Sequence, residues 1–86
     1  MIDNKEKKFR EEYVKLLDEI SAKKAELSRL HREWYKELAD ITKKPDFAEK
    51  EGEYLKTLGD KYAKLIITVE NELETLQYKE LEMLKK

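Results

Sequence analysis

The sequence predicts an all-α protein: an antiparallel helical hairpin of two long amphipathic helices that dimerises into a four-helix bundle or coiled coil. Apolar residues recur at helical spacing along almost the whole chain, and Pro45 marks its one strong break. Charged residues make up 45% of the chain and hydrophobic residues 40%, with two glycines and one proline, a composition typical of long or coiled helices. At 86 residues, the chain makes a single domain (1–86), a size at which one core is marginal and self-association is common.

The first helix is expected over residues 3–42. Asp3 and Glu6 have the spacing of a capping box, which satisfies free amides of the first helical turn. No glycine or proline interrupts this segment, and one apolar side chain recurs at every seventh position: Tyr13, Ile20, Leu27, Trp34 and Ile41. This spacing predicts one continuous apolar stripe.

A turn at residues 43–46 separates this helix from a second one over residues 46–85. Pro45 disfavours helix at Lys44 and has no amide to donate, and Asp46 with Glu49 repeats the capping-box spacing. The second apolar stripe steps by 4, 4 and 3 residues, an eleven-residue period: Tyr54, Leu58, Tyr62, Leu65, Val69, Leu73 and Leu76. Such a period indicates a nearly straight helix.

Gly59 leaves two possibilities open for the second helix. It either caps a short helix, or it lies inside a continuous or mildly bent helix at a cost of about 1 kcal/mol relative to alanine. The stripe keeps its phase across Gly59, which favours the continuous helix.

A short connection between two long helices predicts antiparallel packing. With the turn centred at residues 44 and 45, the expected neighbours across the seam are Tyr13 with Leu76, Ile20 with Val69, Leu27 with Tyr62, and Trp34 with Leu55 and Leu58. Gly59 then faces Leu30, so its missing side chain is expected to leave room for Leu30 or Trp34.

The apolar surface extends beyond what one seam can bury. Ile67 lies about 160° from Val69 around a helix, so the two cannot face the same neighbour. The residues expected outside the seam are Val14, Leu17, Tyr35, Ile66, Ile67, Leu81 and Met83. Burying a leucine or isoleucine contributes about 1.5–3 kcal/mol, so we expect a second copy of the chain, a protein partner, or both, to cover this surface.

The predicted protein-binding residues are Trp34, Tyr35, His31, Ile67, Glu70 and Glu74. Trp34 and Tyr35 lie about 100° apart, so one of them flanks the seam, and aromatic side chains of this kind are frequent interface anchors. The alternative is Trp34 in the core with Tyr35 at its boundary. Glu70, Glu72 and Glu74 form either a solvated face or an acidic rim that pairs with a basic surface, such as residues 23–32 of another copy.

Nucleic acid is not the expected partner. Lysine and arginine number 19 against 20 acidic residues, a net charge of -1, so no global field attracts nucleic acid or an anionic membrane. Weak candidate contacts exist at Lys23, Lys24, Arg29 and Arg32. Glutamates separate them, which favours lysine stems covering the seam or a polar position that sets the register. A nucleic-acid-associated hairpin regulator is thus kept as an alternative function.

No catalytic, metal or cofactor site is expected, and no small-molecule substrate. The chain has no cysteine, no glycine-rich loop and one histidine, His31, without acids at metal-site spacing. The longest apolar run, residues 65–67, is too short to span a membrane. We therefore expect a cytoplasmic, non-enzymatic protein-binding module, a small adaptor, regulator or inhibitor.

A motif near the C-terminus resembles that of a secreted family. The hairpin form and Tyr78-x-x-x-Glu82 are similar to the helical-hairpin substrates of type VII secretion, which carry a tyrosine four residues before an acid. That family has Trp-x-Gly in its turn, whereas this turn reads Thr42-Lys43-Lys44-Pro45. A secreted hairpin of this kind is thus an alternative, without assignment to the family.

Overall fold

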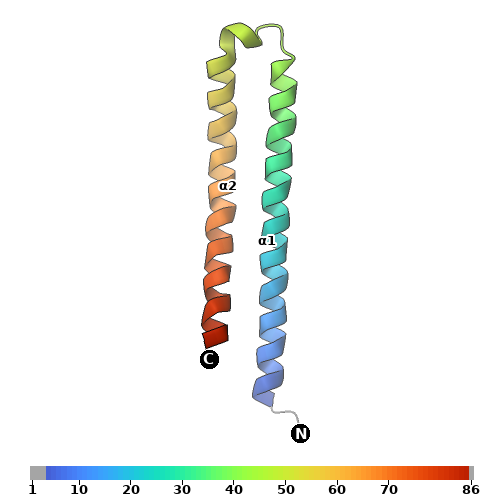
Figure 1. The fold of residues 1–86 in the computed structure, drawn as a ribbon, viewed down its shortest axis with the longest axis vertical. Coiled ribbons are helices and arrows are strands. Elements are labelled where there is room, and N and C mark those ends of the chain that lie inside the picture. Colours follow the sequence, from blue (N-terminus) through green and yellow to red (C-terminus); the bar gives the residue numbers. More distant parts are fainter. Residues whose placement is uncertain (1–3, 86) are drawn as a thin grey trace.

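The computed structural model describes residues 4–85, which form two helices of 39 residues joined by a short connection (Figure 1). Helix α1 spans Asn4–Thr42 and helix α2 spans Phe47–Lys85. They lie side by side and antiparallel, in a hairpin of 71 × 17 × 12 Å. The predicted all-α helical hairpin is confirmed, and the described part of the chain contains no strand. Asp3, and with it the first capping box, lies outside the described residues.

One seam joins the two helices, and its residues follow a heptad spacing of alternating three and four. The seam positions in α1, all of them buried or half-buried, are Tyr13, Leu16, Ile20, Lys23, Leu27, Leu30, Trp34, Glu37 and Ile41, and three flanking side chains, Glu26, His31 and Leu38, are also half-buried. Those in α2 from Tyr62 onward are Tyr62, Ile66, Val69, Leu73, Leu76, Glu80 and Met83. The eleven-residue period predicted for α2 is therefore wrong. Ile66 is buried in the seam, where Leu65 was expected, and Leu65 is exposed.

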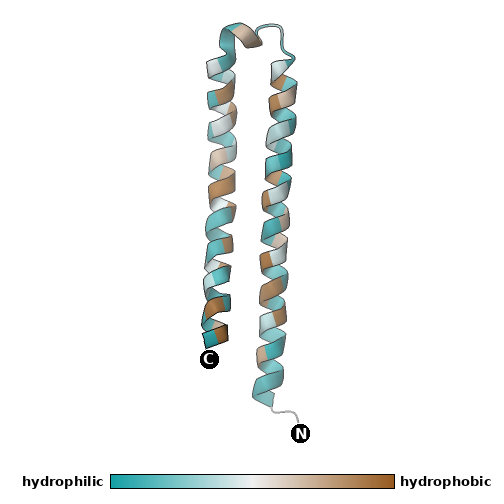
Figure 2. Ribbon diagram, in the orientation of Figure 1, coloured by the Kyte–Doolittle hydropathy of each residue, from teal (hydrophilic) through white to brown (hydrophobic). Residues whose placement is uncertain are grey.

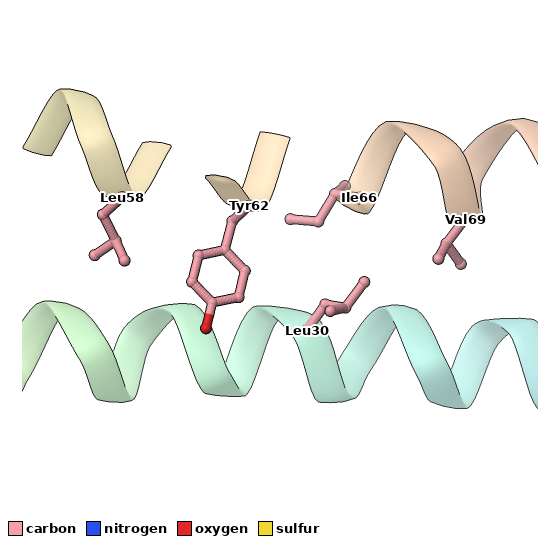
Figure 3. Close-up of a cluster of buried hydrophobic side chains, with 5 residues drawn as sticks. All are labelled: Leu30, Leu58, Tyr62, Ile66 and Val69. Atoms are coloured by element: carbon pink, nitrogen blue, oxygen red, sulfur yellow. The ribbon is translucent and has the colours of Figure 1, made fainter. Parts of the chain in front are cut away.

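The densest packing lies in the half of the hairpin nearer the turn. Four residues of α2 and Leu30 of α1 form a buried cluster (Figure 3): Leu30, Leu58, Tyr62, Ile66 and Val69. Half-buried apolar side chains of α1 pack around it: Leu27, Trp34, Leu38 and Ile41. Burial of each large apolar side chain contributes about 1.5–3 kcal/mol, so this cluster stabilises the hairpin substantially.

The register across the seam differs from the predicted one by a heptad. The ring of Trp34 stacks on that of Tyr62, with centroids 5.9 Å apart and planes 7° apart, whereas Leu27 was expected to face Tyr62. The cause lies at Lys50, whose backbone is not helical (φ -115°, ψ 20°). The first turn of α2 therefore belongs to the connection, and the centre of the turn lies beyond residues 44 and 45. In an antiparallel hairpin, each residue by which this centre moves changes the residue that faces a given position by two.

Side chains hold this connection in place. The hydroxyl of Tyr54 donates to both carboxylate oxygens of Asp46, at 2.9 and 3.0 Å, and the Lys44 ammonium lies 5.0 Å from the centroid of the Tyr54 ring. Lys50 pairs with Asp46 at 3.8 Å. The hydrogen bond to the Asp46 carboxylate raises the pKa of Tyr54. Tyr54 thus anchors the chain on both sides of the bend at Lys50.

Helix α2 runs through Gly59 without interruption, so its bend lies at Lys50 and not at this glycine. A side chain added at Gly59 would meet nothing within 4 Å. The expectation that Gly59 leaves room for Leu30 or Trp34 is therefore wrong. The register shift explains this, since it places other residues of α1 opposite Gly59.

Candidate protein-interaction face

The hairpin has two long faces, one on each side of the seam. On one of them, residues of both helices line a shallow groove: Glu19, Ala22, Lys23, Glu72, Thr75 and Leu76. We call this the paired face. Helical geometry places the opposite flanks of both helices on the other face. This open face consists of Val14, Leu17, Ser21, Lys24, Ser28, His31, Tyr35 and Leu38 of α1, with Asp60, Ala63, Ile67, Glu70, Glu74, Gln77, Leu81 and Leu84 of α2.

On the paired face, ion pairs connect the helices. The Lys23 ammonium, at a half-buried seam position, pairs with the Glu72 carboxylate across the seam and lies 3.6 Å from Glu26. The hydrogen bond to Glu72 raises the pKa of Lys23. Nearer the turn, the Lys61 ammonium lies 3.2 Å from the Glu37 carboxylate. Lys23, Glu72, Lys61 and Glu37 thus have partners within the chain.

Glu37 also pairs with the most deeply buried side chain of the seam. Tyr62 is 3% exposed, and its hydroxyl donates a hydrogen bond to the Glu37 carboxylate. This bond raises the pKa of Tyr62 to about 12 and, with Lys61, lowers the pKa of Glu37. Within residues 4–85, no buried side-chain nitrogen or oxygen lacks a hydrogen-bond partner. The polar groups of the seam are therefore satisfied by this register.

The open face carries most of the large apolar surface that the seam leaves uncovered. Hydrophobic residues recur along both helices and mark the last turns of α2 (Figure 2). Six large side chains of the open face are between 40% and 66% exposed: Val14, Leu17, Tyr35, Ile67, Leu81 and Leu84. Apolar side chains collected on one face in this way make it a candidate surface for protein contact.

Most of the predicted protein-binding residues share this face. His31, Tyr35, Ile67, Glu70 and Glu74 all lie on it, and the side chains of Tyr35 and Ile67 are 66% and 56% exposed. Trp34 does not, because it lies half-buried in the seam against Tyr62, as in the alternative considered from the sequence. Glu72 is likewise removed from the expected acidic rim, since Lys23 of the same chain neutralises it.

The charges of the open face are segregated by helix. The α1 side carries Lys24 and no acidic residue, whereas the α2 side carries Asp60, Glu70 and Glu74 and no basic residue. Lys24, Glu70 and Glu74 are exposed, and none of them forms an ion pair within residues 4–85. The sequence contains this pattern, but it becomes visible only after the seam has fixed which residues share a face.

The four weak candidates for nucleic-acid contact do not form one patch. Lys23 lies in the seam with Glu72, and the Arg29 guanidinium pairs with Glu33 at 2.8 Å. Lys24 lies on the open face, and Arg32 on the outer side of α1. Two of the four charges are thus neutralised locally, and the others point in different directions.

Two other features are absent from the part of the chain that the structure describes. No group of three or more acidic, histidine or cysteine residues could hold a metal ion, and neither helix is long and apolar enough to cross a membrane. Tyr78 is 60% exposed, on the outer side of α2. Comparisons with family models, curated proteins and solved structures give no match. The open face is therefore the basis for assigning a function.

Proposed function

We propose that the chain is a non-catalytic protein-protein interaction module, a small helical adaptor, regulator or inhibitor, that binds a helical surface with its open face. The observation that supports this is the gathering of six large, exposed apolar side chains on one face of a hairpin, whereas the other face carries the two ion pairs that connect its own helices. We place this function in the cytoplasm.

The exposed area supports the same proposal. The hairpin exposes 7153 Å². A compact monomer of 10.4 kDa exposes about 5,400 Å². Complete burial of a leucine or isoleucine contributes about 1.5–3 kcal/mol, so a second helical surface docked onto the open face gains part of this amount at each half-exposed side chain that it covers. A straight helical face is also suited to another helix, because side-chain ridges of one helix fit the grooves of another.

Site-specific photocrosslinking in cells tests this proposal. A benzophenone amino acid replaces Tyr35 or Leu81 on the open face and, as matched controls, the exposed Thr68 or Thr75 on the flank of α2 that borders the paired face. We expect protein adducts from the two open-face positions and few or none from the controls. Equal adduct formation at all four positions, or none at the open-face positions, would contradict the proposal.

A further inference from the structure

We infer that the protein bound by the open face is a second copy of this chain, in a symmetric dimer whose twofold axis runs parallel to the helices. This inference rests on the proposed function, because it uses the same face and names its partner. In this arrangement α1 of each copy packs on α2 of the other, and both turns lie at the same end of a four-helix bundle.

The unpaired charges of the open face select this arrangement. The ion pair between Lys23 and Glu72 fixes the heights of the two helices, so Lys24 lies level with Glu70 and within about one helical turn of Glu74. Rotation about an axis parallel to the helices keeps these heights. It therefore brings Lys24 of one copy to Glu70 and Glu74 of the other, and the contact occurs twice by symmetry.

Other residues of the open face also face suitable neighbours in this dimer. At the same register, Val14 lies level with Leu81, and Ile67 lies level with the small Ser28. In the dimer, Val14 therefore meets the partner's Leu81, and Ile67 packs over the partner's Ser28. Tyr35 comes level with the partner's Asp60, a carboxylate that can accept a hydrogen bond from its hydroxyl.

The other symmetric arrangement is disfavoured. A twofold axis perpendicular to the helices lays α1 on α1 and α2 on α2, with the turns at opposite ends. When the axis passes at the centre of the open face, Lys24 meets Lys24 and Glu70 meets Glu70, and like charges in an interface are repulsive. An axis nearer the open end avoids these contacts but shortens the overlap.

The size of the face is sufficient for a stable dimer. The hairpin measures 71 by 17 Å across its two long axes, and a standard protein interface buries about 800 Å² per partner. Since the hairpin exposes more area than a compact monomer of its mass, a dimer of this kind removes surface that the fold itself leaves uncovered.

Light scattering over a concentration series, with charge-reversed variants, tests the dimer. We expect the wild type to dimerise, and Lys24→Glu or the pair Glu70→Lys with Glu74→Lys each to raise the dimer dissociation constant by about tenfold or more. Combining all three substitutions restores opposite charges at each contact and is expected to restore the dimer. The control Lys64→Glu makes the same charge change on the outer side of α2 and should have little effect.

Spin labelling tests the direction of the axis. The chain has no cysteine, so Lys43→Cys at the turn provides a single labelling site. Turns at the same end give a label-to-label distance of about 20–30 Å, whereas turns at opposite ends separate the labels by a distance comparable to the 71 Å length of the hairpin. A long distance, or a dimer indifferent to Lys24→Glu, overturns the inference. A wild-type monomer that still forms open-face adducts with a different protein also overturns it, but leaves the proposed function intact.

Discussion

Two adjacent isoleucines offer a direct test of which surface the hairpin buries. Ile66 is 6% exposed in the seam, and Ile67 is 56% exposed on the open face. Ile66→Ala removes a buried side chain and leaves a cavity, which is expected to cost about 3 kcal/mol. That corresponds to a fall in melting temperature of about 15 °C for a domain of this size. Ile67→Ala loses only partial burial and gains helix propensity, so we expect a change within about 0.5 kcal/mol in the monomer.

The two variants are compared by thermal and urea denaturation, followed by circular dichroism. Both are measured in the Lys24→Glu background at a protein concentration below its raised dimer dissociation constant, where we expect a monomer, and then in the wild-type background at rising protein concentration. In the monomer, only Ile66→Ala should be strongly destabilising. In the dimer, Ile67→Ala should also lower stability, because Ile67 then packs against the partner. Equal losses in the monomer would refute the assignment of Ile66 to the seam and Ile67 to the open face.

Three further predictions concern single features of the hairpin. Because the pKa of Tyr62 is raised to about 12 from 10.0, the stability from its bond to Glu37 should be complete below pH 10 and lost as the pH rises through 12. An absorbance titration should show one late-ionising tyrosine that is missing in Tyr62→Phe. Gly59→Ala should raise stability to urea by up to about 1 kcal/mol, because Gly59 is helical and its added methyl meets nothing within 4 Å; a loss would indicate strain at this site. Lys23→Leu should raise the melting temperature and Lys23→Glu should lower it, since Lys23 occupies a seam position opposite Glu72; the reverse order would contradict the observed register.

The hairpin itself was predictable from local chemistry. The recurrence of Tyr13, Ile20, Leu27 and Trp34 at every seventh position identifies the buried side of α1 without ambiguity. In α2, Leu65, Ile66 and Ile67 are all apolar, so any one of these three residues could continue the apolar stripe into the seam. Only contact with α1 decides among them, which explains why Leu65 was assigned to the seam in place of Ile66.

The composition of the candidate site was predictable in part. Surplus apolar residues and the absence of bases near Glu70 and Glu74 pointed to α2, and the angle between Trp34 and Tyr35 showed that one of them lies outside the seam. Which of the two lies in the seam depended on Tyr62, whose ring stacks on that of Trp34. The neutralisation of Glu72 depended on the register, which in turn depended on the backbone at Lys50.

A heptad pattern alone cannot fix the register of a hairpin, because a shift by seven residues returns an apolar residue to every apolar position. The polar residues in the seam remove this ambiguity. In the predicted register, with Leu27 against Tyr62, Lys23 lies level with Ile66 and has no carboxylate directly opposite it on α2. In the observed register, Lys23 reaches Glu72, and Glu37 reaches both Tyr62 and Lys61. An unpaired polar group in the seam carries the full cost of its desolvation, whereas a displaced apolar contact is replaced by a similar one. The half-buried charges that interrupt the apolar stripe are thus the residues that select a single alignment, and that alignment in turn places Lys24 level with Glu70 on the open face.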